Sequence, residues 1–316
     1  MPSRGTMIAA GAVASAGLAI LGAVGGVFGL LAAYFAALPL FVVGFVSGRQ
    51  ACAVAMAAAA ITVGAALGPD EALMFIGAQG VPAALMVWLS LRMRVASDGA
   101  VEWAPPGTVL AWLACYGAVA FVALAMVLLN EAGSSQGLET GLATELQHAV
   151  TAVAPGADPD RVQAVTAAFA RYFPAIVLAS WIVMTVANAV IGFRIAGRFF
   201  ERQRPEPRWS ALTLPSWLMT VTAAASFLAL VGRGSSVGFV GGNAALGLCV
   251  PYVLLGFAVA HTFAARLGSR RVVLWGLYLL VFMLGWPLFL MAGLGFVEDW
   301  IGVRRRFAGP RPEDER

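Results

Sequence analysis

The sequence predicts an all-α fold, a polytopic helical membrane bundle of eight to nine transmembrane helices. Hydrophobic residues make up 60% of the 316 residues and charged residues 11%, whereas about 25% of a soluble domain is charged. The mean hydropathy is +0.85. Nine apolar stretches contain no Asp, Glu or Lys. A soluble core could not bury this much apolar surface, so we expect the chain in a bilayer.

The nine stretches are close to the length of about 20 residues that a helix needs to cross the hydrocarbon core. Arg4 precedes the first stretch as in a signal peptide, but a second stretch follows at once, so we expect a retained span. The predicted spans are Ile8–Val24, Val27–Val46, Ala51–Leu67, Leu73–Leu91, Thr108–Leu129, Phe173–Phe193, Leu212–Val231, Phe239–Ala265 and Val272–Phe296.

Arginine placement predicts the orientation, because short cytoplasmic loops are enriched in basic residues. All basic residues are Arg, which together with abundant Ala and Gly is typical of a GC-rich bacterial genome, so we expect the bacterial inner membrane. The segment 130–172, on the opposite side, has five acidic and two Arg residues, a net charge of −3. The Arg residues that share the predicted cytoplasmic side with the N-terminus are Arg4, Arg49, Arg92, Arg94, Arg194, Arg198, Arg202, Arg204, Arg208, Arg266, Arg270 and Arg271.

The ninth stretch leaves two topologies open. If Val272–Phe296 crosses fully, Arg304 to Arg306 lie outside, against the charge rule. Alternatively the stretch bends back at Gly285-Trp286-Pro287 as two half-helices, since Pro disrupts a helix. We favour the second topology, which leaves the C-terminus in the cytoplasm.

The outer segment 130–172 is expected to be partly helical. Its apolar residues recur at three- to four-residue spacing, which is typical of an amphipathic helix: Leu138, Leu142, Leu146, Val150 and Val153. Asp158-Pro159-Asp160 then provides an N-cap, a Pro at the first helical position and an acid in the first turn. We expect the helix that begins there to continue into the sixth span, with a kink at Pro174.

Small residues recur at four-residue spacing inside the spans, and such faces let membrane helices approach closely. Two roles are open for these small-residue faces: docking against a partner subunit, or packing between helices of this chain. The most regular examples are Ala12 and Ala16, Gly22 and Gly26, and Ala51, Ala55 and Ala59.

The absence of acidic residues from the spans limits the chemistry. It argues against a transporter coupled to ions through intramembrane Asp or Glu, and against an intramembrane aspartyl or metalloprotease. Cys52, Cys115 and Cys249 have no CxxC spacing, so we expect no disulfide or metal site. We also expect no catalytic activity, no cofactor and no nucleic-acid partner.

The candidate ligand-binding residues are the few polar side chains within the spans: Gln79, Asn188, Asn243 and Tyr252. With Ser180 and Trp181 they could surround a small cavity for a neutral or weakly polar ligand. The alternative is that the amides form hydrogen bonds between helices.

The C-terminal quarter resembles the YybS-like membrane proteins, a family without an assigned function. The matching features are Gly242-Asn243, Gly256 and His261 in one long span, and the run Gly293-Leu294-Gly295-Phe296-Val297-Glu298-Asp299-Trp300 followed by Arg304 to Arg306. Where that family has Asp-Phe before the first Arg, this chain has Gly302-Val303. The family is grouped with the substrate-binding S-components of energy-coupling-factor importers and with the MreD shape-determining proteins.

That resemblance implies two functions. The first is an S-component-like module that binds and transports a small molecule, and the alternative is an MreD-like scaffold without transport. We predict one membrane domain over residues 1–307 and a disordered polar tail at 308–316. The residues predicted to contact lipid headgroups or a membrane or cytoplasmic protein partner are Arg202, Arg204, Arg208, Glu298, Asp299, Arg304, Arg305 and Arg306.

Overall fold

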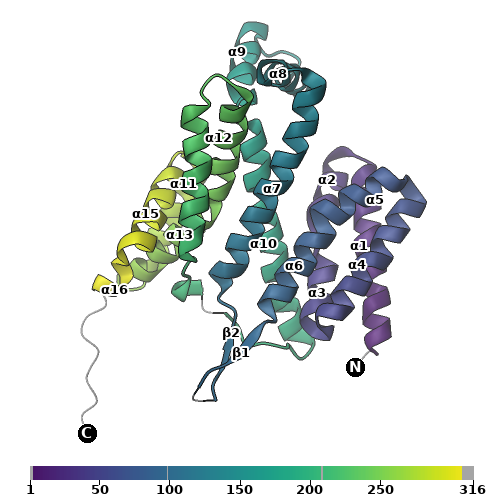
Figure 1. Cartoon of the computed structure of the whole chain (residues 1–316), viewed down its shortest axis with the longest axis vertical. Helices are drawn as coiled ribbons and strands as arrows, with labels where there is room; N and C mark the ends of the chain where they lie inside the picture. The colour runs from purple at the N-terminus through teal and green to yellow at the C-terminus, as the bar shows by residue number, and fades with distance from the viewer. Residues whose placement is uncertain (1–2, 98, 208, 308–316) are drawn as a thin grey trace. The chain divides into compact units, whose positions relative to one another are not determined.

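A computed structural model describes residues 3–97, 99–207 and 209–307, which are almost entirely helical (Figure 1). The predicted tail 308–316 and Arg208 lie outside the described residues. The chain forms two compact units, Met1–Tyr116 with Ser180–Pro207, and Gly117–Ala179 with Arg208–Arg316. We call them unit 1 and unit 2. Their boundaries fall within two long helices, α7 (Pro106–Ala132) and α10 (Phe173–Phe199).

The predicted all-α membrane bundle is confirmed. Seven helical segments of the described chain are long and apolar enough to cross a bilayer, and they coincide with seven predicted spans. The eighth, α11 (Ser216–Val231), is a shorter apolar helix. The ninth stretch is divided at Gly285 into α14 (Arg270–Leu284) and α15 (Pro287–Ile301).

Unit 1 is built around α4, which packs against α1, α3, α5 and α6. Ala12 and Ala16 of α1 and Ala51, Ala55 and Ala59 of α4 are at most 4% exposed, so this small-residue face is used for packing within the unit. In chain order, unit 1 begins with α1 (Arg4–Ala23), α2 (Gly26–Phe35), α3 (Leu38–Ser47), α4 (Arg49–Leu67), α5 (Pro69–Phe75), the π-helix η1 (Ile76–Gly80) and α6 (Val81–Ser90).

Two of the spans in unit 1 are interrupted near their centres. The segment Gly26–Ser47 breaks between α2 and α3, where Pro39 occupies the first turn of α3. The segment Pro69–Ser90 changes from α to π geometry over η1, directly before Pro82. Proline has no backbone N–H, so each proline leaves carbonyl groups of the preceding turn without their helical donor.

A two-stranded hairpin in unit 1 was not predicted. β1 (Met93–Val95) pairs antiparallel with β2 (Val101–Trp103), so that Arg94 lies opposite Glu102. The apolar and polar residues alternate in both strands, and Gly99 in the turn has a φ of +81°. This alternation with a glycine turn is a hairpin signal, but it is short and lies between two much stronger span signals.

The segment 130–172 contains α8 (Ser135–Val153) and α9 (Pro159–Ala170), so it is partly helical as predicted. The predicted cap is also confirmed, because the Asp158 carboxylate accepts a hydrogen bond of 3.0 Å from the backbone N–H of Asp160. The expectation of a continuous helix into the sixth span was wrong. The chain breaks after Ala170, and Pro174 lies in the first turn of α10 instead of at a kink. A proline is well accommodated there because the first N–H groups of a helix have no intrahelical partner.

The remainder of unit 2 consists of η2 (Trp209–Ala211), α11, α12 (Ser236–Leu248), α13 (Val250–Ala264), α14, α15 and α16 (Val303–Phe307). Helices α11 and α12 pack side by side, as do α13 and α15 (Figure 1). A Cβ atom on Gly256 would overlap the Met291 carbonyl, and one on Gly295 would overlap the Tyr252 carbonyl. The two glycines therefore permit the close approach of α13 and α15.

Candidate functional site

At the break between α2 and α3, backbone carbonyl groups accept hydrogen bonds from side chains of three other elements of unit 1. The Ser15 hydroxyl of α1 donates to the Ala36 carbonyl at 2.6 Å. Asn188 of α10 donates from Nδ2 to the Tyr34 carbonyl at 2.6 Å. Gln79 of η1 donates from Nε2 to the Ala33 carbonyl at 3.3 Å. Interrupted backbone at membrane depth persists only where protein or water covers it, and here α1, η1 and α10 provide that cover.

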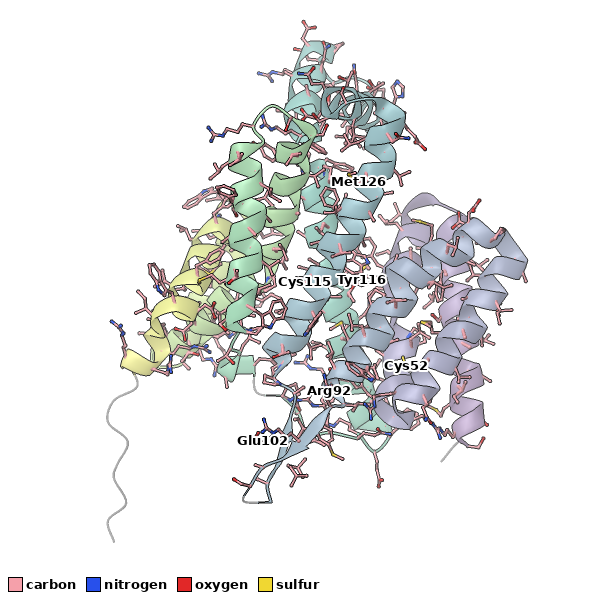
Figure 2. All side chains as sticks on the ribbon, viewed as in Figure 1. Cys52, Arg92, Glu102, Cys115, Tyr116 and Met126 are labelled. Carbon is pink, nitrogen blue, oxygen red and sulfur yellow. The ribbon has the colours of Figure 1, made fainter. Side chains whose placement is uncertain are left out.

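Carbonyl groups of the π-helix η1 also accept hydrogen bonds from side chains of other helices. The missing N–H of Pro82 would donate to the Ala78 carbonyl in an α-helix and to the Gly77 carbonyl in a π-helix. Instead, Trp181 Nε1 donates to the Ala78 carbonyl at 2.9 Å and the Tyr116 hydroxyl donates to the Gly77 carbonyl at 2.7 Å. Tyr116 lies on α7 (Figure 2), and its ring centroid is 6.2 Å from that of Trp181.

Two amide oxygens at this place have no donor. Asn188 is 1% exposed, and its Nδ2 also donates to the Met184 carbonyl at 3.1 Å. Within residues 3–97, 99–207 and 209–307, neither Asn188 Oδ1 nor Gln79 Oε1 receives a hydrogen bond, although both atoms are buried. Leaving such an acceptor unsatisfied costs about 1–3 kcal/mol. Each of the two oxygens therefore has an acceptor position that no donor of the described residues fills.

We call the side chains around these two helix irregularities the polar cluster. The Tyr34 hydroxyl adds a contact of 3.3 Å to the Ser180 hydroxyl. The polar cluster consists of Ser15, Tyr34, Gln79, Tyr116, Ser180, Trp181 and Asn188, all in unit 1.

The structure brings together Gln79 and Asn188, whereas the other two predicted ligand residues belong to unit 2. Asn243 joins the end of α9 to the start of α10: its Oδ1 accepts from the Ala175 N–H at 2.9 Å, and its Nδ2 donates to the Arg171 carbonyl at 3.2 Å. Tyr252 is fully buried and stacks on Phe296 with ring centroids 3.8 Å apart. Both side chains are thus engaged in packing or capping.

Ser15, Tyr34 and Tyr116 were not among the predicted site residues. Ser15 and Tyr116 matter because they donate to backbone carbonyl groups at the two helix irregularities, and Tyr34 contributes a hydroxyl that contacts Ser180. The available signal was a proline near the middle of an apolar span, at Pro39 and Pro82. It predicts that donors are needed there, but it does not say which helix supplies them.

The predicted charged contact residues have different environments. Arg202 forms an ion pair of 3.5 Å with Glu206 at the surface. Arg204 is 9% exposed and donates from Nη1 to the Ser90 carbonyl at 2.8 Å, and burial lowers the pKa of its guanidinium. Its guanidinium also lies 5.7 Å from the ring centroid of Trp103.

The C-terminal charged residues lie in unit 2. Glu298 is 7% exposed and pairs with Arg304, from Oε1 to Nε at 2.8 Å. Arg304 also donates to the carbonyl of Leu212, in the Arg-rich connection between α10 and α11. Asp299 is half-buried, and Arg305 and Arg306 are exposed.

Comparisons with known proteins identify one family. A family model described as "Predicted membrane protein (DUF2232)" matches residues 13–298. No curated protein and no solved structure gives a significant match. The finer resemblances to YybS-like proteins, S-components and MreD therefore stay predictions. The matched region includes the interrupted spans, the polar cluster and the Gly256–Gly295 crossing, and the chain belongs to the DUF2232 family of predicted membrane proteins.

Proposed function

We propose that this membrane protein is a small-molecule-binding module, and that the polar cluster of unit 1 recognises its ligand. The observation that carries the proposal is the pair of buried amide oxygens, Gln79 Oε1 and Asn188 Oδ1, beside two interrupted spans. Buried polar groups are ordinarily hydrogen-bonded, so a pair of unsatisfied acceptors suits a ligand that brings its own donors.

The interrupted helices support the same function. Discontinuous helices near the bilayer centre form the substrate sites of many transporters, and π-bulges are frequent at functional sites. The side chains that complete the two breaks come from four separate parts of the chain.

The ligand class follows from the charges. An unpaired ion at this depth is costly, and the apolar stretches that form the polar cluster carry no Asp, Glu or Lys: Ile8–Val24, Val27–Val46, Leu73–Leu91, Thr108–Leu129 and Phe173–Phe193. We therefore infer an uncharged ligand with N–H or O–H donors. A transport role would require an energy source from another protein, as in S-component-type importers.

The test is extraction of the tagged protein into lipid nanodiscs, followed by mass spectrometry of the small molecules and proteins that accompany it. We expect a stoichiometric small molecule with the wild type, reduced about tenfold or more by Asn188→Leu or Gln79→Leu, as a loss of about 1.4 kcal/mol predicts. The matched control is Thr185→Val, because Thr185 is equally buried on α10 but its hydroxyl is satisfied by the Trp181 carbonyl.

A thermal unfolding curve for each variant separates loss of ligand from loss of fold. The alternative function, a scaffold, predicts a stoichiometric protein partner without a small molecule. That result with a folded wild-type protein would refute the binding module. We further propose that both termini lie in the cytoplasm of a bacterial cell, with the segment 130–172 outside.

A further inference from the structure

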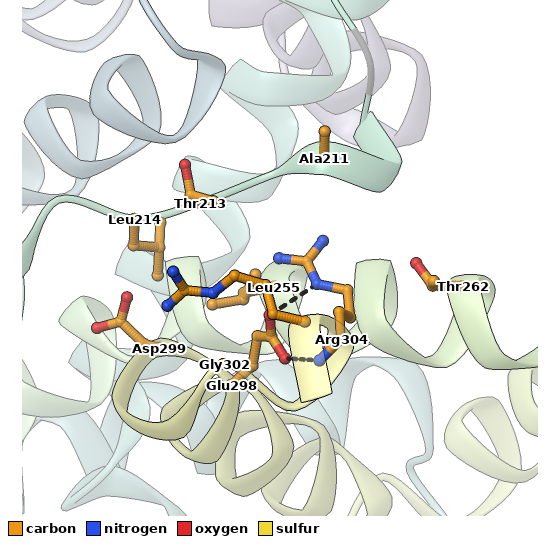
Figure 3. Close-up of a pocket in the computed structure, with 10 residues that line it drawn as sticks. Ala211, Thr213, Leu214, Leu255, Thr262, Glu298, Asp299, Gly302 and Arg304 are labelled. Carbon is orange, nitrogen blue, oxygen red and sulfur yellow. Dashed lines mark hydrogen bonds and ion pairs between the residues drawn. The ribbon is translucent and has the colours of Figure 1, made fainter. Parts of the chain in front are cut away.

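A second candidate site lies in unit 2, where α13, α15 and α16 meet the segment that precedes α11. The pocket has a volume of about 500 Å³, within the range of about 300–1,000 Å³ for small-molecule sites. Its lining combines apolar, hydroxyl and charged side chains and includes Thr213, Leu214, Leu255, Thr262, Asp299 and Arg305. Figure 3 shows this arrangement.

The ion pair at the base of the pocket is internally satisfied. Glu298 accepts from both Nε and the backbone N–H of Arg304, at 2.8 and 2.9 Å. Arg304 has a further acceptor in the Leu212 carbonyl. The charges of Glu298 and Arg304 neutralise each other and hold α16 beside α15. We therefore do not expect a ligand to bind to this pair.

The next acid and the next base of the pocket remain available. In the described part of the chain, neither Asp299 nor Arg305 forms an ion pair. Burial, and then the adjacent Glu298, raise the pKa of the Asp299 carboxyl group, and a bound cation would offset both effects. Arg305 lies against Gly302, which has a φ of +67°. Its Nε and Nη2 atoms lie 2.9 Å from the place of a Cβ, so a side chain at this position would displace the guanidinium as well as strain the backbone.

We propose that this pocket binds a phosphoethanolamine group, with Arg305 contacting the phosphate and Asp299 contacting the ammonium. A guanidinium forms strong paired hydrogen bonds to phosphate oxygens, and a carboxylate accepts from a primary ammonium. The two free charges are opposite and belong to one pocket, which matches a zwitterion better than a simple anion or cation.

The position of the pocket favours a lipid headgroup as the source. Thr262 lies near the end of the Ser236–Ala264 span, and Thr213 lies shortly before α11, so the pocket lies where membrane helices end. Trp300, beside Asp299, is 82% exposed, as is typical of an aromatic residue at the bilayer interface. Leu214 and Leu255 provide apolar contacts.

The test is native mass spectrometry of the full-length protein titrated with phosphatidylethanolamine, phosphatidylcholine or phosphatidylglycerol of identical acyl chains. We expect a preference of about tenfold for phosphatidylethanolamine, because the quaternary ammonium of phosphatidylcholine has no N–H and phosphatidylglycerol has no cation. Asp299→Asn should abolish the preference, because it removes the carboxylate that the ammonium contacts. Arg305→Gln should weaken the binding of all three lipids, because each of them carries a phosphate. Gly302→Ala, which removes no charge but displaces Arg305, should weaken the binding of all three lipids in the same way.

The matched control is Arg306→Gln, since Arg306 is the neighbouring exposed Arg and does not line the pocket. Soluble phosphoethanolamine distinguishes the sources. Displacement of the lipid by the soluble compound would support the headgroup chemistry with a soluble ligand, whereas no displacement would support a membrane lipid. Equal binding of the three lipids by the wild type, or an equal effect of Arg306→Gln, would overturn the proposal.

Discussion

Asn188 Nδ2 donates a 2.6 Å hydrogen bond to the backbone carbonyl of Tyr34, which lies 154 residues earlier in the sequence. This bond illustrates how unit 1 tolerates an interrupted span, because a side chain of one helix provides a donor for the backbone of another. The same arrangement occurs at η1, where Trp181 and Tyr116 donate hydrogen bonds to the carbonyl groups of Ala78 and Gly77.

Trp181→Phe is expected to lower the free energy of unfolding by about 1–3 kcal/mol, because the Ala78 carbonyl loses its donor while Pro82 still provides none. The measurement is thermal or denaturant unfolding of the purified protein in detergent. Pro82→Ala restores a backbone N–H, so Trp181→Phe should cost less in that background. Equal costs in both backgrounds would contradict this account of η1. Trp275→Phe, at a 77% exposed position, is the control.

Gly256→Ala and Gly295→Ala are each expected to destabilise unit 2 by about 1–3 kcal/mol through overpacking, since the new methyl group would overlap a carbonyl of the facing helix. Both variants separate α13 from α15, so the double variant should cost less than the sum. Gly276→Ala on α14 is the matched control. It faces open space in the interior of a helix and should be neutral or stabilising by up to about 1 kcal/mol. Additive effects of Gly256→Ala and Gly295→Ala would indicate that the two glycines act at separate contacts.

The spans and the cap at Asp158 could be predicted because each depends on local sequence: apolar length for the spans and a short polar motif for the cap. The polar cluster could be predicted only in part. Gln79 and Asn188 are unusual in apolar spans and were found for that reason. Their partners are backbone carbonyls of Ala33 and Tyr34, which carry no sequence signal.

Asn243 lies in a different environment from Asn188. Both residues are asparagines within predicted apolar spans. However, the Oδ1 atom of Asn243 accepts a hydrogen bond from the Ala175 N–H. The two asparagines differ because the first turn of α10 lies beside the Asn243 side chain, and this arrangement depends on tertiary packing. The hairpin at β1 and β2 was missed because three-residue strands give little periodicity.

Glu298→Ala is expected to lower the free energy of unfolding by about 3–5 kcal/mol, since it leaves the Arg304 guanidinium, 12% exposed, without its carboxylate. Glu206→Ala removes the partner of Arg202 from a pair with 29% and 57% exposed side chains, and it should cost only about 0–1 kcal/mol. Chemical unfolding of both variants in the same detergent gives the comparison. Equal costs would mean that Arg304 is solvated well enough to need no partner.

The last prediction concerns the path of α14 and α15. Each helix has 15 residues, which at about 1.5 Å per residue is shorter than the hydrocarbon core of about 30 Å. Thr262, before α14, and Arg304, after α15, line one pocket, so the two ends of this segment lie close together, which favours the proposed return to one side of the membrane. A membrane-impermeant maleimide should therefore label Ser269→Cys and Arg306→Cys from the same side, in a background with Cys52, Cys115 and Cys249 replaced by Ala. The control is Ser134→Cys, which should be labelled from the opposite side if the segment 130–172 lies outside as proposed. Labelling of Ser269→Cys and Arg306→Cys from opposite sides would show that α14 and α15 together cross the bilayer, and would place the C-terminal arginines against the charge rule.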